Sequence, residues 1–253
     1  MKIVVLPRRL MSAAACAAAA AAMFLLVSHP NAVGAAATKR ALPIYAVQTQ
    51  EKRAALTFDA AWGNEDTQAL IDILGRYDVK ATFFLVGNWV DNYPESVKAL
   101  SDAGHSVQNH SNTHPHMTGL SPDAVAAEAN ACNDKIEAIT GVRPTLLRPP
   151  YGDYNDTVVN TIRSLGMEPI QWDVDSLDWK ELQAPEITRR VLEKVQPGSI
   201  VLFHNAALHT PEALSGIIQS LQAQGYTLVT VNELIAPPPY TIDHAGRQVP
   251  GGQ

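Results

Sequence analysis

Five short groups of residues contain the side chains of this chain that could do chemistry. They are Thr-Phe-Asp at 57–59, His-Ser-Asn-Thr-His at 110–114, Arg-Pro-Pro-Tyr-Gly at 148–152, Asp-Ser-Leu-Asp-Trp at 175–179 and Leu-Phe-His at 202–204. Together they supply carboxylates, imidazoles and a guanidinium, which are groups that bind metal ions and transfer protons. Each group closes a stretch typical of a β-strand, so in a fold of alternating strands and helices all five would share one rim.

A pair of histidines in the second group could bind a metal ion. His110 and His114 are spaced i and i+4, which on a helical turn places two imidazoles on one side, where both can face one cation. Two neutral imidazoles suit zinc, cobalt or nickel. The alternative is that one of the three clustered histidines, counting His116, is only a polar surface residue.

Three further residues could transfer or orient protons, and each also has a plain structural explanation. Asp59 ends a strand, where a carboxylate is either a helix cap or a catalytic group. Arg148 would make a surface ion pair or, beside a catalytic carboxylate, hold that carboxylate ionised. His204 ends an apolar strand and is either a buried histidine with satisfied hydrogen bonds or, with a carboxylate partner, a general acid near neutral pH.

Trp179 and Leu202 would be core residues or form an apolar pocket at the rim.

The elements that would position these residues alternate along the chain. Apolar and β-branched runs predict seven strands, at about 54–58, 81–86, 105–109, 145–147, 168–174, 199–203 and 227–231. Helical patterns lie between them, near 67–77, 94–103, 121–139, 156–165, 185–194 and 211–224. This alternation predicts an α/β fold with a mostly parallel sheet. Seven units favour a distorted, incomplete (β/α) barrel.

The composition along the chain predicts four segments. Residues 1–37 read as a signal peptide or an N-terminal membrane anchor, and residues 38–52 as a linker or an edge segment. Residues 53–236 form the α/β domain. Residues 237–253 contain three consecutive prolines and two terminal glycines, so we expect neither helix nor strand there but a loosely ordered, flexible tail.

The N-terminal segment and the charge bear on location and partners. Residues 1–37 carry Lys2, Arg8 and Arg9 but no acidic residue, so their removal takes the formal net charge from −6 to about −9. An acidic exported protein is a poor nucleic-acid binder. Cys132 would then be the one remaining cysteine, which excludes an intrachain disulfide. We expect a monomer that is secreted or extracytoplasmic and associated with the cell wall or the membrane.

The five groups, in this order over residues 53–235, resemble those of the polysaccharide deacetylases, the NodB-homology proteins of carbohydrate esterase family four. The resemblance implies metal-dependent hydrolysis of N-acetyl groups on sugar polymers. It implies that Asp59 is the general base that activates water, that His110 and His114 hold the metal, and that Arg148 orients Asp59. The backbone N–H of Tyr151 would help to stabilise the oxyanion.

The same resemblance assigns roles to four later residues. Asp178 would orient His204, the general acid that protonates the departing amine. Trp179 and Leu202 would enclose the acetyl methyl group. Amide hydrolysis needs a polarised carbonyl, an activated water and a protonated leaving nitrogen, and these residues with a divalent metal, zinc above all, would supply them.

Ala60 departs from the family pattern. Most members carry a second aspartate directly after the base, as a third metal ligand, whereas this chain has Ala60. Two histidines with water bind a cation less tightly, so we expect weak metal binding, although Asn64, Glu65 or Asp66 could contribute a ligand. The Thr-Phe-Asp-Ala-Ala-Trp-Gly pattern also resembles a subgroup from spore-forming bacteria, which favours peptidoglycan as the substrate.

These observations predict an exported peptidoglycan N-deacetylase that acts on N-acetylglucosamine or N-acetylmuramic acid. One alternative is a deacetylase of chitooligosaccharides or another chitin-like chain. A second, suggested by Ala60, is a catalytically degenerate module that binds glycan without cleaving it. A third, an extracytoplasmic metal-binding protein, rests only on the clustered histidines.

Overall fold

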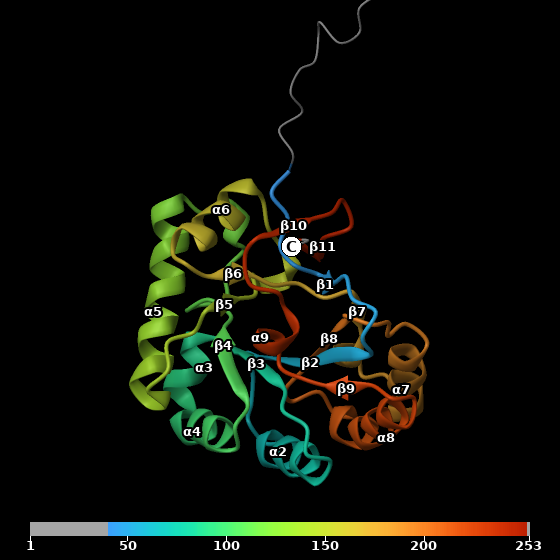
Figure 1. The fold of residues 1–253 in the computed structure, drawn as a ribbon. Coiled ribbons are helices and arrows are strands. Elements are labelled where there is room, and N and C mark those ends of the chain that lie inside the picture. The colour runs from blue at the N-terminus through green and yellow to red at the C-terminus, as the bar shows by residue number, and fades with distance from the viewer. Residues whose placement is uncertain (1–39, 252–253) are drawn as a thin grey trace, which may run out of the picture. The chain divides into compact units, whose positions relative to one another are not determined.

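The computed structural model describes residues 40–251, and its centre is a curled sheet that forms half a barrel (Figure 1). Seven parallel strands lie in the order β6-β5-β4-β3-β2-β8-β7, and β9 pairs with the start of β2 outside this path. The strands are β2 (Arg53–Ala60), β3 (Thr82–Leu85), β4 (Ser106–Asn109), β5 (Leu146–Leu147), β6 (Glu168–Pro169), β7 (Val174–Asp175), β8 (Ile200–His204) and β9 (Thr227–Leu228). The predicted α/β fold, a distorted and incomplete barrel, is confirmed.

Helices connect the strands, and six of them were expected from the sequence. These are α2 (Thr67–Arg76), α4 (Pro94–Asp102), α5 (Pro122–Thr140), α6 (Asp156–Ser164), α7 (Ala184–Leu192) and α8 (Thr210–Ala223). Two short helices were not predicted, α3 (Gly87–Asn92) and α9 (Val231–Leu234). Helix α9 begins with a capping box between Thr230 and Glu233, a pattern that can be recognised in the sequence. Because the helix begins there, the strand expected at 227–231 is shorter than predicted.

The single strand predicted at 168–174 is in the structure two short strands, β6 and β7, which lie at opposite edges of the sheet. Strand β6 pairs with β5 and strand β7 pairs with β8, although only residues 170–173 separate them. The segment before β2 lies against this crossing. The Ile44 N–H donates to the Pro169 carbonyl, the Gln171 N–H donates to the Ile44 carbonyl, and the Val47 N–H donates to the Gly198 carbonyl. Residues 44–47 therefore lie against both the segment between β6 and β7 and the turn before β8.

The prediction that residues 237–253 form neither helix nor strand is wrong for the described part of that segment. Strands β10 (Tyr240–Ile242) and β11 (Arg247–Pro250) form a hairpin, and β11 pairs in parallel with β1 (Ala46–Val47). The Asp243 carboxylate holds the turn by accepting from the N–H groups of Ala245 and Arg247. The pairing with β1 joins segments about 200 residues apart, so local composition could not reveal it.

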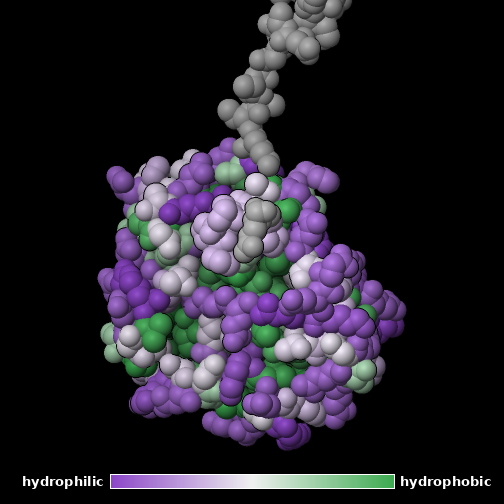
Figure 2. Space-filling view, in the orientation of Figure 1, coloured by the Kyte–Doolittle hydropathy of each residue, from purple (hydrophilic) through white to green (hydrophobic). Residues whose placement is uncertain are grey.

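Residues 1–37, expected to be a signal peptide or membrane anchor, lie outside the described residues, as do the first two residues of the expected linker. No helix within 40–251 is both long and apolar enough to cross a membrane. In the orientation of Figure 1 the described surface is mostly hydrophilic, and hydrophobic atoms lie mainly in recesses (Figure 2).

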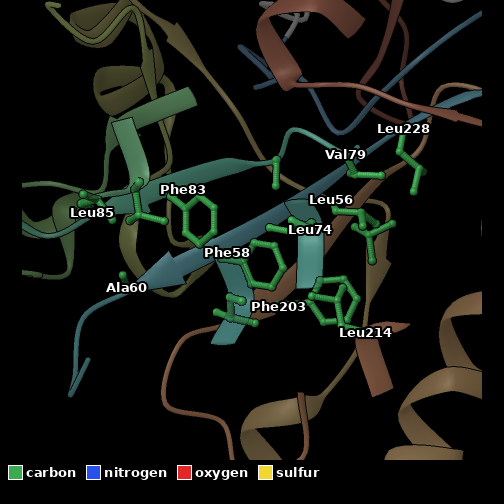
Figure 3. Close-up of a cluster of buried hydrophobic side chains, with 14 of the residues drawn as sticks. Leu56, Phe58, Ala60, Leu74, Val79, Phe83, Leu85, Phe203, Leu214 and Leu228 are labelled. Atoms are coloured by element: carbon green, nitrogen blue, oxygen red, sulfur yellow. The ribbon is translucent and has the colours of Figure 1, made fainter. Parts of the chain in front are cut away.

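The alternation of side chains along β2 separates the core from the site. Leu56, Phe58 and Ala60 belong to a buried apolar cluster, in which the Phe58 ring stacks on Phe83 at 4.8 Å and on Phe203 at 5.4 Å (Figure 3). Because successive side chains of a strand point to opposite faces, Asp59 points the other way, into the half-barrel. The packing of Phe58 thus fixes the direction of Asp59.

The contact between β1 and the turn before β8 gives a stability prediction. Gly198 has φ 85°, and a Cβ atom there would lie 1.8 Å from the Val47 carbonyl oxygen. Gly198→Ala should therefore lower the free energy of unfolding by more than the roughly 1–2 kcal/mol that a left-handed conformation costs by itself. Urea denaturation measures the loss.

Gly216→Ala is the matched control, because Gly216 lies within α8 and a Cβ there meets no atom within 4 Å. It should leave stability unchanged or raise it by up to about 1 kcal/mol. Equal unfolding midpoints for the two variants would contradict the close approach of β1.

Candidate active site

Four of the residues expected at the rim come together at the carboxyl ends of the strands. Asp59 and His204 are direct partners on the neighbouring strands β2 and β8. His110 follows β4, and Arg148 follows β5. His110 Nε2 lies 3.5 Å from Asp59 Oδ2, and Arg148 Nη1 lies 2.6 Å from Asp59 Oδ1. Asp59 is therefore the residue on which the others converge.

Arg148 holds Asp59 from inside the half-barrel. Its side chain is fully buried, and Nη1 donates to Asp59 Oδ1 and, at 2.9 Å, to Thr57 Oγ1. Nη2 donates to the Gln171 carbonyl, and the guanidinium lies 4.2 Å above the Phe84 ring. Burial alone would raise the pKa of Asp59, but Arg148, with His110 and His204, holds that pKa below its usual 3.8. Asp59 is thus ionised at neutral pH.

The loop at 110–114 brings two imidazoles together, but not as a helical turn. The His110 and His114 ring centroids are 5.0 Å apart. The expectation of a helical turn is wrong, because Ser111 and His114 have φ 66° and 61°. The Glu128 carboxylate of α5 accepts from the Asn112 and Thr113 N–H groups, so side-chain contacts replace helical hydrogen bonds. The two rings therefore lie close together, as the i, i+4 spacing predicted, but in a loop and not on a helical turn.

The pair fits a divalent cation through its protonation state. His110 Nδ1 lies 2.6 Å from the Arg148 carbonyl oxygen, so Nδ1 carries the proton and Nε2 presents a lone pair toward Asp59 Oδ2. Burial lowers the pKa of His110 and lowers the pKa of His114 to about 4, so both rings are neutral at pH 7. His110 Nε2 thus has a lone pair to offer to a cation, and the negative charge of the nearby Asp59 carboxylate favours a cation there.

Most family members have a third metal ligand, and the described residues of this chain contain no counterpart to it. No group of three or more His, Cys, Asp or Glu side chains within 40–251 is arranged to hold a metal ion. Of the loop residues considered as substitutes, Asn64 donates to Ser96, and Asp66 accepts from the Ala206 N–H through Oδ2. Ala60 belongs to the apolar cluster. Among residues 40–251 the proposed donor set is thus the two imidazoles, and such a set binds a cation less tightly than one with a third ligand.

His204 is held by a buried carboxylate. Its Nδ1 and its backbone N–H each lie 2.8 Å from an oxygen of Asp178, which is itself buried and also accepts from the Thr210 hydroxyl. Burial alone would lower the pKa of His204, but the hydrogen bond and charge of Asp178 raise it above 6.5. With Nδ1 occupied, Nε2 is the nitrogen available to a substrate.

The three remaining predicted residues have different surroundings. Trp179 is exposed and lines a hollow of about 300 Å³ together with His204. Leu202 is buried two residues before His204 on the same face of β8, and it does not line that hollow. Tyr151 is exposed, has φ 60°, and places its ring 4.5 Å from that of His114. The structure therefore brings Trp179 and Tyr151 to the rim and leaves Leu202 beneath it.

Sequence reasoning missed Asn205 and Thr210, which support Asp59 and Asp178 respectively. The Asn205 N–H donates to the Asp59 carbonyl, and its side chain bonds the loop after Asp59. Thr210 donates to Asp178. The position of Asn205 directly after His204 is the available signal, whereas nothing local marks Thr210, which acts across 32 residues.

Comparison with known proteins adds to this geometry. The family model described as polysaccharide deacetylase matches residues 46–170, which include Asp59, His110, His114 and Arg148. The chain is also 33% identical over 195 residues to the peptidoglycan-N-acetylmuramic acid deacetylase PdaA of Bacillus subtilis, covering 76% of this chain and 74% of PdaA. The chain belongs to the polysaccharide deacetylase family.

Two other relatives differ in what they do. The peptidoglycan-N-acetylmuramic acid deacetylase PdaC of Bacillus subtilis is 39% identical over 74% of this chain, which spans 40% of the length of PdaC. A solved structure of a family 4 carbohydrate esterase pseudoenzyme from Bacillus anthracis is 40% identical, covering 77% of this chain and 69% of that one, with a TM-score of 0.74. A mutant of that pseudoenzyme has restored enzymatic activity.

The His204–Asp178 pair gives a prediction about titration. Asp178→Asn should lower the pKa of His204, because the charge that raises it is lost, and NMR titration of the histidine ring measures this. In the parent, the pair contributes fully to stability below pH 6.5, and this contribution is lost as the pH rises through the raised pKa.

Asp175→Asn is the matched control, since Asp175 raises the pKa of His204 only through its charge and makes no hydrogen bond to the ring. Its effect should be the smaller one. An unchanged His204 titration in Asp178→Asn would contradict the pairing.

Proposed function

We propose that this protein is an exported, metal-dependent polysaccharide N-deacetylase that acts on peptidoglycan sugars. The observation that carries this proposal is the placement of Asp59, ionised by Arg148, directly opposite His204, which Asp178 supports. A base and an acid on adjacent strand ends match the two proton transfers of amide hydrolysis.

Asp59 serves as the general base. Arg148 occupies Oδ1, so Oδ2 is the oxygen that accepts the proton of the attacking water. His204 serves as the general acid, giving the proton on Nε2 to the departing amine while Asp178 stabilises the positive ring. A divalent cation held by His110 and His114, zinc by preference with cobalt or nickel as alternatives, supplies polarisation of the amide carbonyl when bound. The backbone N–H of Tyr151 would help to stabilise the oxyanion.

The relatives and the N-terminus support the proposed substrate and the proposed location. PdaA and PdaC are named for N-acetylmuramic acid in peptidoglycan, and other relatives for N-acetylglucosamine. The layout of residues 1–37 supports export, with either release or retention at the membrane. Trp179 is exposed and lines the same hollow as His204, which supports a role in binding the acetyl group. Leu202 is buried in β8 beneath this hollow. All residues assigned to this chemistry lie in one chain, so we propose that the protein acts as a monomer.

A glycan-binding module without catalysis is the second candidate, and two observations favour it. Ala60 occupies the position of the usual third metal ligand, and the similar pseudoenzyme from Bacillus anthracis belongs to the same family. In this alternative the rim still binds sugar, while the two imidazoles hold too little metal to polarise the amide.

Acetate release tests the proposal against the alternative. The purified protein, supplied with zinc or cobalt, should release acetate from N-acetylated muropeptides or chitooligosaccharides. Asp59→Asn and His204→Ala should each lower the rate by about 10² to 10⁴, because each removes one proton transfer. Enzymatic quantification of acetate measures the rate.

Two exposed residues provide matched controls for these substitutions. Asp72→Asn on α2 and His244→Ala in the turn between β10 and β11 remove the same groups at exposed positions outside the five rim motifs. Both should retain the parent rate. Glycan binding without acetate release from any substrate would exclude the hydrolase and leave the binding module.

A further inference from the structure

The sheet of the half-barrel does not close between β6 and β7, and a short stretch of chain crosses this opening. Strands β6 and β7 are the two ends of the strand order (Figure 1). Residues 170–173 connect them, and we call these residues the crossing segment. Its two ends bond to the sheet through the Ile170 and Asp173 N–H groups. Its middle, Gln171 and Trp172, lies between the edges and depends on contacts from other parts of the chain.

Ile44, in the N-terminal segment before β2, holds the crossing segment. The Ile44 N–H donates to the Pro169 carbonyl at 2.9 Å, and the Gln171 N–H donates to the Ile44 carbonyl at 2.7 Å. The Ile44 side chain is fully buried in an apolar cluster against which Trp172 packs. Ile44 lies outside residues 46–170, which the family model matches. A residue beyond the matched part of the chain therefore fixes this side of the half-barrel.

Arg148 depends on the same crossing segment. Its Nη2 donates to the Gln171 carbonyl at 3.1 Å, and its guanidinium lies 5.5 Å from the centre of the Trp172 ring. The guanidinium also lies 4.2 Å from the Phe84 ring, a member of the apolar cluster that contains Ile44. Its Nη1 donates to Asp59. Arg148 is thus held between the general base and the crossing segment.

The turn at Tyr151 and Gly152 rests on the crossing segment as well. Both residues have positive φ, 60° and 67°. A Cβ atom on Gly152 would lie 3.0 Å from Trp172 Cη2 and 3.3 Å from Gln171 Oε1, so the turn packs directly on these two side chains. Because the Tyr151 N–H is the proposed donor to the oxyanion, two groups assigned to catalysis share one support.

We propose that the N-terminal segment at Ile44 positions the general base, by fixing the crossing segment that holds Arg148 against Asp59. Protein interiors are close-packed, so a shift of the crossing segment is passed on to the buried guanidinium. A misplacement of about 1 Å can lower a catalytic rate about 10²-fold. Ile44 touches no reacting atom and is therefore a positioning residue. The inference deepens the proposed function and rests on it for the identity of the reaction.

Exchange of the Arg148 guanidinium protons with solvent tests this inference without any substrate. Arg148 is the one buried arginine among residues 40–251, so its side-chain N–H signal in a protein with ¹⁵N-labelled arginine should exchange slowly, and contacts with the Phe84 ring assign it. Ile44→Ala should accelerate this exchange about tenfold or more, because the crossing segment then opens without global unfolding. Ile44→Val, which keeps most of the side chain, should accelerate it less.

Ile218→Ala on α8 is the matched control. Ile218 is as fully buried as Ile44 but belongs to a different apolar cluster. The substitution removes the same atoms and should lower global stability comparably, yet it should leave the exchange of Arg148 close to that of the parent. If Ile44→Ala does not fold, Ile44→Val and Ile218→Val are compared in its place. Equal acceleration in the two members of a pair, or none in the Ile44 variant, would overturn the inference.

Acetate release separates positioning from a loss of folded protein. At a temperature where both variants are fully folded, Ile44→Ala should lower kcat about 10- to 100-fold and leave KM nearly unchanged, because the base is misplaced while the rim that binds sugar is intact. Ile218→Ala should keep both constants. A raised KM at unchanged kcat would contradict the inference. Faster Arg148 exchange in Ile44→Ala, with no acetate released by the parent, would support the positioning and overturn the proposed hydrolysis alone.

Discussion

The buried ion pair between Arg148 and Asp59 is the interaction on which the rest of the site depends. Both charged groups are buried, so each needs the other as a counter-charge. Removing either one would leave an uncompensated buried charge and destabilise the fold. The pair ties the ends of β2 and β5 across the half-barrel. Its influence extends further, since the Arg148 carbonyl fixes the tautomer of His110 and the guanidinium reaches the Gln171 carbonyl of the segment between β6 and β7.

The pair explains why base and acid can coexist on adjacent strands. Arg148 keeps Asp59 ionised despite burial, while Asp178 keeps a proton on His204 despite burial, so the two environments push their pKa values apart. The cores behind the strands make this arrangement rigid, because Phe58 and Phe203 pack on the opposite faces of β2 and β8 from Asp59 and His204.

Much of the fold and the site could be predicted because the signals are local. Apolar runs identify the strands, and strand ends in a parallel sheet meet at one edge, so Asp59 and His204 were expected to converge. The left-handed backbone of Ser111 and His114 could not be predicted, because it accompanies side-chain contacts of the loop with Glu128 of the following helix α5. The hairpin of β10 and β11 depends on pairing with β1, and the support of the Trp62 loop depends on Trp89 and Asn205. Each of these is a contact between segments that the sequence does not place side by side.

The ionisation of Asp59 tests the central claim most directly. Selective ¹³C labelling of aspartate carboxyl groups, assigned with Asp59→Asn, allows the Asp59 titration to be followed by NMR in the intact protein. The ion pair predicts a midpoint below the ordinary 3.8, with the stability it provides present above that pH and lost as the pH falls through the midpoint. A midpoint near neutral pH would mean that burial outweighs Arg148, and Asp59 would then be protonated where the account needs a base.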